Sequence, residues 1–332
     1  MRLLVLGGTG FVGGAVVTEA VRRDWTVTVL NRGLHGTVPP GVSLVVGDRN
    51  DADCFAGLDG QWDLVVDTWD GAPVAVQRSA GFLESRTPYY AYVSSRSVYR
   101  EPVALGVDES WPTAPASPSA VDGTYAELKS GAERAVTDVF GERALLARAG
   151  LILGPGEDIG RLPWWLGRIA RGGTVLAPGP SELPLQYIDA RDLAGWLLDR
   201  ADDWHGGPVN VVSRTGHTTM DALLAACVAA TGSSAVLRWV DPAPILAAGV
   251  VPWNDLPIWI PPGHEYRWLH EADVSRAYSL GLRPRPVSST VSDTWEWLRS
   301  MGGVPARAGR PARASVGLDP EREAALLAGQ RA

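Results

Sequence analysis

Lysine is almost absent from this chain of 332 residues: of its 30 basic residues, 29 are Arg and one, Lys129, is Lys. The formal net charge is -7, and no cluster of basic residues provides a surface for nucleic acid or for an anionic membrane. We therefore expect neither as a partner. The bias also raises the question of why one position alone keeps a compact ammonium group.

Cysteine is scarce too, and long apolar runs are missing. Cys54 and Cys227 are too few for a disulfide framework or a metal site, and the five His show no ligand spacing, so we expect no metal. The chain opens with a strand-like pattern rather than a signal peptide. We expect a cytoplasmic protein.

Short apolar runs alternate with helical patterns through the first half of the chain, which is typical of a parallel sheet with crossover helices. We predict an α/β fold with a doubly wound parallel sheet (Rossmann) over residues 1–150, to which a segment at about 185–212 returns. The expected strands are Leu3–Leu6, Thr26–Leu30, Ser43–Val46, Leu64–Val66, Tyr89–Ser94 and Ala144–Ala147, and the expected helices include Val12–Arg23 and Pro73–Glu84.

The composition changes after about residue 150. Residues 151–300 are rich in Trp and Pro and are predicted to form a smaller, irregular substrate-binding lobe. Residues 301–332 are expected to hold a linker, Gly302–Ser315, and a short terminal helix. That helix follows Asp319-Pro320-Glu321, which has the pattern of an N-cap, an N1 proline and an early acid.

A glycine-rich turn directly follows the first expected strand and opens the first expected helix. Glycines there let the backbone approach a pyrophosphate, and the helix N-terminus supplies free N–H groups. The turn therefore predicts a dinucleotide site. Its residues assigned to the cofactor are Gly7, Thr9, Gly10, Phe11, Val12 and Gly13.

The end of the second strand bears on which dinucleotide is bound. An NAD-preferring site normally has an acid there for the ribose 2′-OH, but this chain has Asn31 and Arg32. Asn31 does not repel a 2′-phosphate and Arg32 can pair with one, which favours NADP(H) over NAD(H). A solvated Arg32, or one stacked on adenine, is the alternative. Asp48 follows the third strand. It can accept a hydrogen bond from the adenine amino group, or it can be a turn-forming residue.

Tyr125 and Lys129 lie four residues apart, so on a helix both side chains share one face. Thr124 and Glu127 can form a capping box at the start of that helix. A neighbouring cation lowers the pKa of a phenol, so Tyr125 can exchange a proton with a substrate oxygen while hydride moves to or from nicotinamide. Upstream, a strand ends in hydroxyls at Ser94-Ser95, where one of them can orient a carbonyl.

In this order, the motifs resemble an extended, or atypical extended, short-chain dehydrogenase/reductase of the NAD(P)-dependent epimerase/dehydratase-like superfamily. The resemblance covers nearly all of residues 1–300. It rests on the Gly7/Gly10/Gly13 turn, Gly47-Asp48, Ser94-Ser95-Arg96-Ser97-Val98-Tyr99, Tyr125 with Lys129, Leu153-Gly154-Pro155-Gly156 and Tyr187-Ile188-Asp189-Ala190-Arg191-Asp192-Leu193-Ala194. It implies that Tyr125 is the acid/base, that Lys129 also holds the nicotinamide ribose, and that Ser95 is the catalytic hydroxyl. It also implies a homodimer as a common assembly.

Departures from the family pattern bear on the substrate. Arg96 and Ser97 stand where dehydrating relatives have an Asp-Glu pair, so elimination by that route lacks its acid and base. Leu151 and Leu185 replace an Asn and an Arg that often reach the diphosphate of a nucleotide sugar. The resemblance therefore implies a less charged, more hydrophobic substrate.

Several residues are expected to line the pocket. Thr68 and Trp69 follow the fourth strand, where the family has small residues beside the cofactor, so we expect Thr68 to contact the cofactor. Trp69 is expected to shape the pocket or restrict the nicotinamide side. The full set of expected substrate residues is Trp69, Arg96, Ser97, Trp164, Trp165, Trp253 and Trp259. For most tryptophans, a place in the core is the alternative.

Together these patterns predict an NADP(H)-dependent oxidoreductase that reduces a carbonyl, or oxidises the alcohol, of a small, fairly hydrophobic molecule. Two alternatives stay open. One is an epimerase that oxidises and re-reduces a carbinol of a sugar or related molecule with retained NAD(P). The other is a non-catalytic nucleotide-sensing or scaffold protein.

Overall fold

The computed structural model describes residues 1–34, 36–305 and 316–329. Its contacts divide the chain into two compact units. The first unit comprises Met1–Gly150, Ala190–Val212 and Asp273–Arg283, and the second comprises Leu151–Asp189, Ser213–Ala272 and Pro284–Ala332. Most of the expected linker falls on residues 306–315, outside the described residues.

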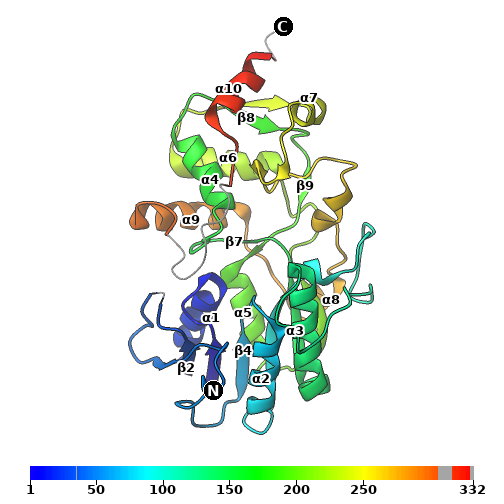
Figure 1. Ribbon diagram of the computed structural model, residues 1–332. Coiled ribbons are helices and arrows are strands. Elements are labelled where there is room, and N and C mark those ends of the chain that lie inside the picture. The colour runs from blue at the N-terminus through cyan, green and yellow to red at the C-terminus, as the bar shows by residue number, and fades with distance from the viewer. Residues whose placement is uncertain (35, 306–315, 330–332) are drawn as a thin grey trace. The chain divides into compact units, whose positions relative to one another are not determined.

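A seven-stranded, fully parallel sheet forms the centre of the first unit, in the order β11-β6-β5-β4-β1-β2-β3 (Figure 1). Its strands are β1 (Arg2–Leu6), β2 (Thr26–Asn31), β3 (Ser43–Val46), β4 (Leu64–Asp67), β5 (Tyr90–Ser95), β6 (Ala144–Ala149) and β11 (Gly207–Val211). The order reverses between β1 and β4, which confirms the doubly wound sheet. In sheets of this kind ligands generally bind at the carboxyl ends of the strands, beside such a reversal.

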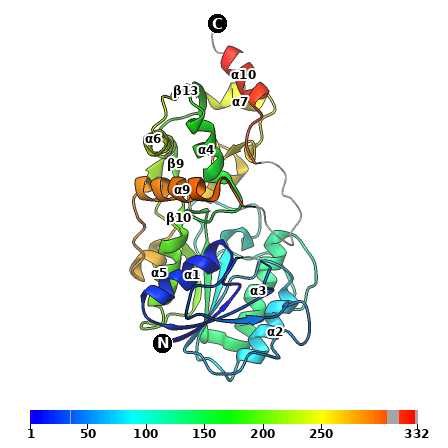
Figure 2. The ribbon, with the colours of Figure 1, turned by 90° about the vertical axis from the view of Figure 1, so that its left-hand side faces the viewer.

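Helices cover both faces of this sheet (Figure 2). On one face α1 (Phe11–Arg22) packs against α5 (Ala190–Asp199), and on the other α2 (Pro73–Leu83) packs against α3 (Tyr125–Phe140). Strands buried on both faces need apolar residues throughout, which explains the continuous run in β1. The sequence-predicted strands and helices agree with these bounds to within one or two residues.

A later segment also belongs to the first unit. Residues Asp273–Arg283, with α8 (Ser275–Ser279), pack with it rather than with the lobe over 151–300 to which the sequence analysis assigned them. The backbone amide of Asp273 donates to the carbonyl of Val107 at 3.0 Å, and the indole N–H of Trp196 donates to the carbonyl of Leu280 at 3.0 Å. These long-range contacts give no periodic signal in the sequence.

The described part of the second unit is built from helices and short strands. Its helices are α4 (Arg161–Ala170), α6 (Met220–Thr231), α7 (Pro242–Ala247), α9 (Val287–Met301) and α10 (Pro320–Gly329). Its strands are β7 (Ile152–Leu153), β8 (Thr174–Pro178), β9 (Pro184–Leu185), β10 (Ile188–Asp189), β12 (Thr218–Thr219), β13 (Val236–Val240), β14 (Pro252–Trp253) and β15 (Leu256–Pro257). Helices α4, α6 and α9 pack together around a large apolar core.

Helix α10 is attached to the second unit by a buried charge pair. Asp319 caps its first turn by accepting from the amide of Glu321 at 2.9 Å. Glu323 accepts from the guanidinium of Arg168 at 2.5 Å and from the amide of Leu176 at 3.0 Å.

In the parts of the chain that the structure describes, no helix is long and apolar enough to cross a membrane.

Candidate active site

The glycine-rich turn joins β1 to α1, and two of its glycines leave no room for a side chain. Gly7 has a φ of +99°, and a Cβ there would lie 2.5 Å from the hydroxyl of Thr68. A Cβ on Gly13 would lie 2.1 Å from the carbonyl oxygen of Gly7. The turn therefore has room for backbone only, and α1 begins at Phe11 with its first N–H groups at the carboxyl edge of the sheet. This cradle fits the pyrophosphate of a dinucleotide.

Residues after β2 surround the same turn. The side-chain amide of Asn31 donates to the hydroxyl of Thr9 at 2.9 Å and its oxygen accepts from the backbone of Gly33 at 2.7 Å. Asn31 therefore shapes the loop that carries the half-buried Arg32. Asp48 accepts from the backbone and side-chain amides of Asn50 at 3.0 and 2.9 Å, so one of its oxygens has the turn-forming role.

Helix α3 places Tyr125 at its first position. The predicted capping box is confirmed: Thr124 accepts from the amide of Glu127 at 3.3 Å, and the Glu127 carboxylate accepts from the amide of Thr124 at 2.8 Å. This cap fixes where the helix begins. Tyr125 is 51% exposed, while Lys129, one turn later, is 4% exposed.

The ammonium group of Lys129 is held by backbone carbonyls. It donates to the oxygen of Trp69 at 2.7 Å and to that of Val93 at 2.8 Å, and it lies 4.7 Å from the ring centroid of Tyr92. Burial, followed by the charges of Asp67 and Tyr125, raises the pKa of Tyr92 well above its ordinary value. Tyr92 therefore stays a neutral phenol, and Lys129 is oriented at the ends of β4 and β5.

Ser94 and Ser95 have different surroundings although they are adjacent. Ser94 is buried and donates to the carboxylate of Glu133 at 2.6 Å. Glu133 also pairs with Arg148 through two hydrogen bonds of 3.0 and 2.8 Å. Ser95 is half-buried, and its hydroxyl accepts from the amide of Ser97 at 3.1 Å. Ser94 is thus part of the framework that joins β5, α3 and β6.

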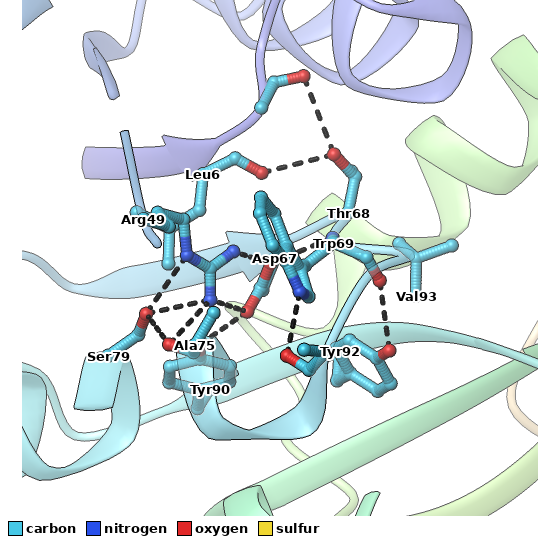
Figure 3. Close-up of polar contacts among 12 residues, drawn as sticks. Leu6, Arg49, Asp67, Thr68, Trp69, Ala75, Ser79, Tyr90, Tyr92 and Val93 are labelled. Atoms are coloured by element: carbon cyan, nitrogen blue, oxygen red, sulfur yellow. Dashed lines mark hydrogen bonds and ion pairs between the residues drawn. The ribbon is translucent and has the colours of Figure 1, made fainter. Parts of the chain in front are cut away.

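A buried ion pair lies beneath Trp69 (Figure 3). The Arg49 guanidinium donates to both oxygens of Asp67 at 2.6 and 2.8 Å and lies 4.9 Å from the Trp69 ring centroid. Burial opposes the charge of Arg49, but Asp67 together with Tyr90 and Tyr92 outweighs it, so the pKa of Arg49 is raised. The sequence analysis missed this cluster: Arg49 directly follows Asp48, but nothing local identifies its partner 18 residues away.

Trp69 follows β4, and its ring is held by several contacts. Its indole is half-buried against the core between the sheet and helices α2 and α3, and its N–H donates to the carbonyl of Ala72 at 3.0 Å. The ring is turned toward Arg49 and Gly71, so it is part of the packing under the loop. The group that Trp69 offers to the site is its backbone carbonyl.

Arg96 and Ser97 form a short 3₁₀ turn, Arg96–Val98, directly after Ser95. The Arg96 side chain is 1% exposed and lies against Gly150, where a Cβ would come within 2.8 Å of its terminal nitrogen. Burial lowers the pKa of the Arg96 guanidinium to about 10. Ser97 is half-buried at the same strand end.

Two of the four expected pocket tryptophans of the second unit belong to its core. Trp165 and Trp259 are fully buried, and their indole N–H groups donate to the carbonyls of Pro257 and Gly179 at 2.8 and 2.9 Å. A large apolar ring with its N–H satisfied is a stable core residue, so the expectation of a pocket wall is wrong for these two. Trp164 and Trp253 are only partly buried.

Comparison with known proteins identifies the fold. No protein-family model matches the chain, and no curated protein matches it. Among solved structures, a UDP-galactose 4-epimerase is 20% identical, with 91% of this chain and 99% of that chain covered and a TM-score of 0.63. WbmH of Bordetella bronchiseptica, solved with NAD+, is 17% identical over 91% of this chain and 99% of its own, with a TM-score of 0.67.

A third match is the UDP-glucose 4-epimerase of Thermus thermophilus in complex with NAD, which is 21% identical over 90% of this chain and 99% of its own, with a TM-score of 0.61. At these identities the likeness establishes the fold. The chain therefore has the fold of these epimerases and related extended short-chain dehydrogenase/reductases, as the motifs indicated.

Proposed function

We propose that this chain binds a nicotinamide dinucleotide and catalyses hydride transfer at a carbinol or carbonyl carbon. The observation that carries the proposal is the placement of Lys129, which is buried, held by two carbonyl oxygens and one helical turn after Tyr125. The glycine cradle lies on the same sheet, at the carboxyl end of β1. Such an arrangement suits an enzyme better than a nucleotide-sensing or scaffold protein.

The residues have separate roles in this reaction. The bound nicotinamide supplies the hydride acceptor or donor. Tyr125, as phenolate, removes the proton from a substrate hydroxyl during oxidation and returns it during reduction. The charge of Lys129 stabilises that phenolate, and the hydroxyl of Ser95 donates a hydrogen bond to the same substrate oxygen.

Epimerisation with retained cofactor is the form of this chemistry that the solved structures favour, because they include UDP-galactose and UDP-glucose 4-epimerases. The sequence-based preference for a reductase acting on a hydrophobic molecule has no support from them. In the epimerase reaction, Tyr125 takes the proton from a carbinol and gives it back after the hydride returns to the opposite face. The substrate is then a sugar or a related small molecule.

The nucleotide that the purified protein carries separates the two reactions. An epimerase keeps NAD(P) bound through purification, releases it on denaturation, and equilibrates a carbinol with its epimer with no net change in reduced-nicotinamide absorbance. A protein purified free of nucleotide, with product formed in proportion to nicotinamide oxidised or reduced, would contradict epimerisation and support the reductase.

One observation keeps the reductase as a second candidate. Leu151 and Leu185, which stand where many relatives have diphosphate-binding residues, are 5% and 1% exposed within the core of the second unit. These positions offer no polar group to a diphosphate. A substrate panel for either reaction should therefore include carbinols and carbonyls that carry no nucleotide.

We further propose that Arg32 favours NADP(H). Replacing Arg32→Ala should weaken NADPH binding about tenfold or more while changing NADH binding little, because a charge-assisted contact to the 2′-phosphate contributes roughly 1.5–3 kcal/mol. Dissociation constants for both nucleotides measure this. Arg22→Ala, which removes an exposed arginine paired with Glu19 on α1, is the control. Equal losses for the two nucleotides would show that Arg32 does not read the 2′ group.

A further inference from the structure

The loop after β4, residues 68–72, contacts both halves of the proposed site. On one side, the Thr68 hydroxyl donates to the carbonyl of Leu6 at 3.0 Å, beside the glycine-rich turn. On the other side, the carbonyl of Trp69 accepts from Lys129 at 2.7 Å and from the hydroxyl of Tyr92 at 2.9 Å. The position of the Lys129 ammonium therefore depends on the orientation of the Trp69 peptide group.

Several contacts fix the Trp69 residue itself. Its backbone amide donates to the Asp67 carboxylate at 2.9 Å, and its indole N–H donates to the carbonyl of Ala72 at 3.0 Å. Gly71 packs against the indole so closely that a Cβ would lie 2.9 Å from the ring, and the guanidinium of Arg49 stacks on the ring. The ring and the amide are thus both attached to the Arg49–Asp67 pair.

The pair is itself fixed in direction by further hydrogen bonds (Figure 3). Arg49 donates to the hydroxyl of Ser79 at 2.7 and 3.0 Å, and the hydroxyl of Tyr90 donates to Asp67 at 2.6 Å. The side chains of Arg49 and Asp67 are 4% and 0% exposed. Apolar residues of similar volume generally give as much stability as a buried ion pair. What they lack is the directional bonding that selects one orientation of the loop.

We propose that Arg49 is a positioning residue for Lys129: with Asp67 it holds Trp69 so that the Trp69 carbonyl orients the ammonium group. The proposal rests on the function proposed above, in which Lys129 stabilises the Tyr125 phenolate. Arg49 touches neither Tyr125 nor Lys129 in this scheme and acts only through the loop. Its removal is expected to change the environment of Lys129 even when the fold is kept.

The single lysine of the chain makes the test direct. With lysine labelled with ¹³C at Cε alone and an untagged chain, the only labelled side-chain NMR signal is that of Lys129. We expect the double variant R49M/D67N, which leaves no unpaired buried charge, to shift or split this signal. It should also lower kcat by about tenfold or more, because small displacements of catalytic groups cost rate steeply.

A matched variant separates positioning from stability. R168M/E323Q removes a buried pair of the second unit and should leave the lysine signal and kcat unchanged, whatever its effect on the melting temperature. If R49M/D67N only lowers the melting temperature and leaves the signal and kcat of the wild type, the proposal is overturned.

A milder variant tests the proposal if the double variant does not fold. Trp69→Phe loses only the indole N–H bond to Ala72 and part of the stacking, and we expect it to move the lysine signal in the same direction by less. An unchanged signal in Trp69→Phe, with R49M/D67N unfolded, would also overturn the proposal. Because the signal is recorded without substrate, it decides the role of Arg49 even if the wild type turns over no substrate and the proposed function fails.

Discussion

Replacing Tyr125→Phe is expected to lower kcat by about 10²- to 10⁴-fold, which is the range that a positioned acid/base contributes. The phenol is the group proposed to move the proton, and Phe keeps the ring but not the hydroxyl. Because Tyr125 stands at the first position of α3 and is half exposed, its hydroxyl is not needed for folding. Steady-state kinetics with a substrate identified from the panel proposed above, together with nucleotide dissociation constants, measure the effect.

The matched control is Tyr89→Phe. Tyr89 directly precedes β5, at the opposite end of that strand from Ser95, and stacks on Trp204 with ring centroids 4.4 Å apart. Loss of the Tyr89 hydroxyl should leave kcat and nucleotide binding unchanged. Wild-type turnover in the Tyr125 variant would refute the acid/base assignment, whichever of the two reactions is catalysed.

Gly13→Ala is expected to weaken dinucleotide binding by about 10- to 100-fold. The added Cβ would meet the carbonyl oxygen of Gly7 at 2.1 Å, so the turn must open. Overpacking of this kind costs roughly 1–3 kcal/mol, and each 1.4 kcal/mol is about tenfold in binding. Titration of the nucleotide-free protein with NAD(P) measures the loss, and circular dichroism shows whether the fold is kept.

The adjacent glycine provides a matched control. A Cβ on Gly14 would have its nearest neighbour, the carbonyl oxygen of Gly8, at 4.0 Å, an ordinary contact. Gly14→Ala should therefore leave nucleotide binding unchanged and raise the free energy of unfolding by up to about 1 kcal/mol, since Ala is the better helix former. Equal binding losses at Gly13 and Gly14 would contradict a cradle built on Gly7 and Gly13.

The parallel sheet, the glycine-rich turn and the start of α3 could be predicted from the sequence because their signals are local. Buried parallel strands are continuous apolar runs, and the turn after β1 is marked by its glycines. The start of α3 at Tyr125 followed from Thr124 and Glu127, three residues apart, and the structure confirms that capping box. Each of these features is encoded within one element and its immediate neighbours.

The buried charges could not be predicted in the same way. Arg49 and Asp67 pair across two strand ends, and Glu133 on α3 pairs with Arg148 on β6. A charged residue in a sequence normally indicates solvent, and only the folded chain shows that these are enclosed. The expectation of a pocket wall was wrong for a related reason. Trp165 is apolar enough for a core and large enough for a pocket wall, and sequence periodicity does not distinguish a core position from a pocket position.

The attachment of α3 to β5 at two successive turns has a mechanical consequence. Lys129 bonds the carbonyl of Val93 and Glu133 bonds the hydroxyl of Ser94, so the helix can neither slide along its axis nor roll about it without breaking one of these bonds. These two bonds, one helical turn apart, keep α3 in one position on β5. The first turn of α3, which carries Tyr125, is therefore held by the framework of the first unit.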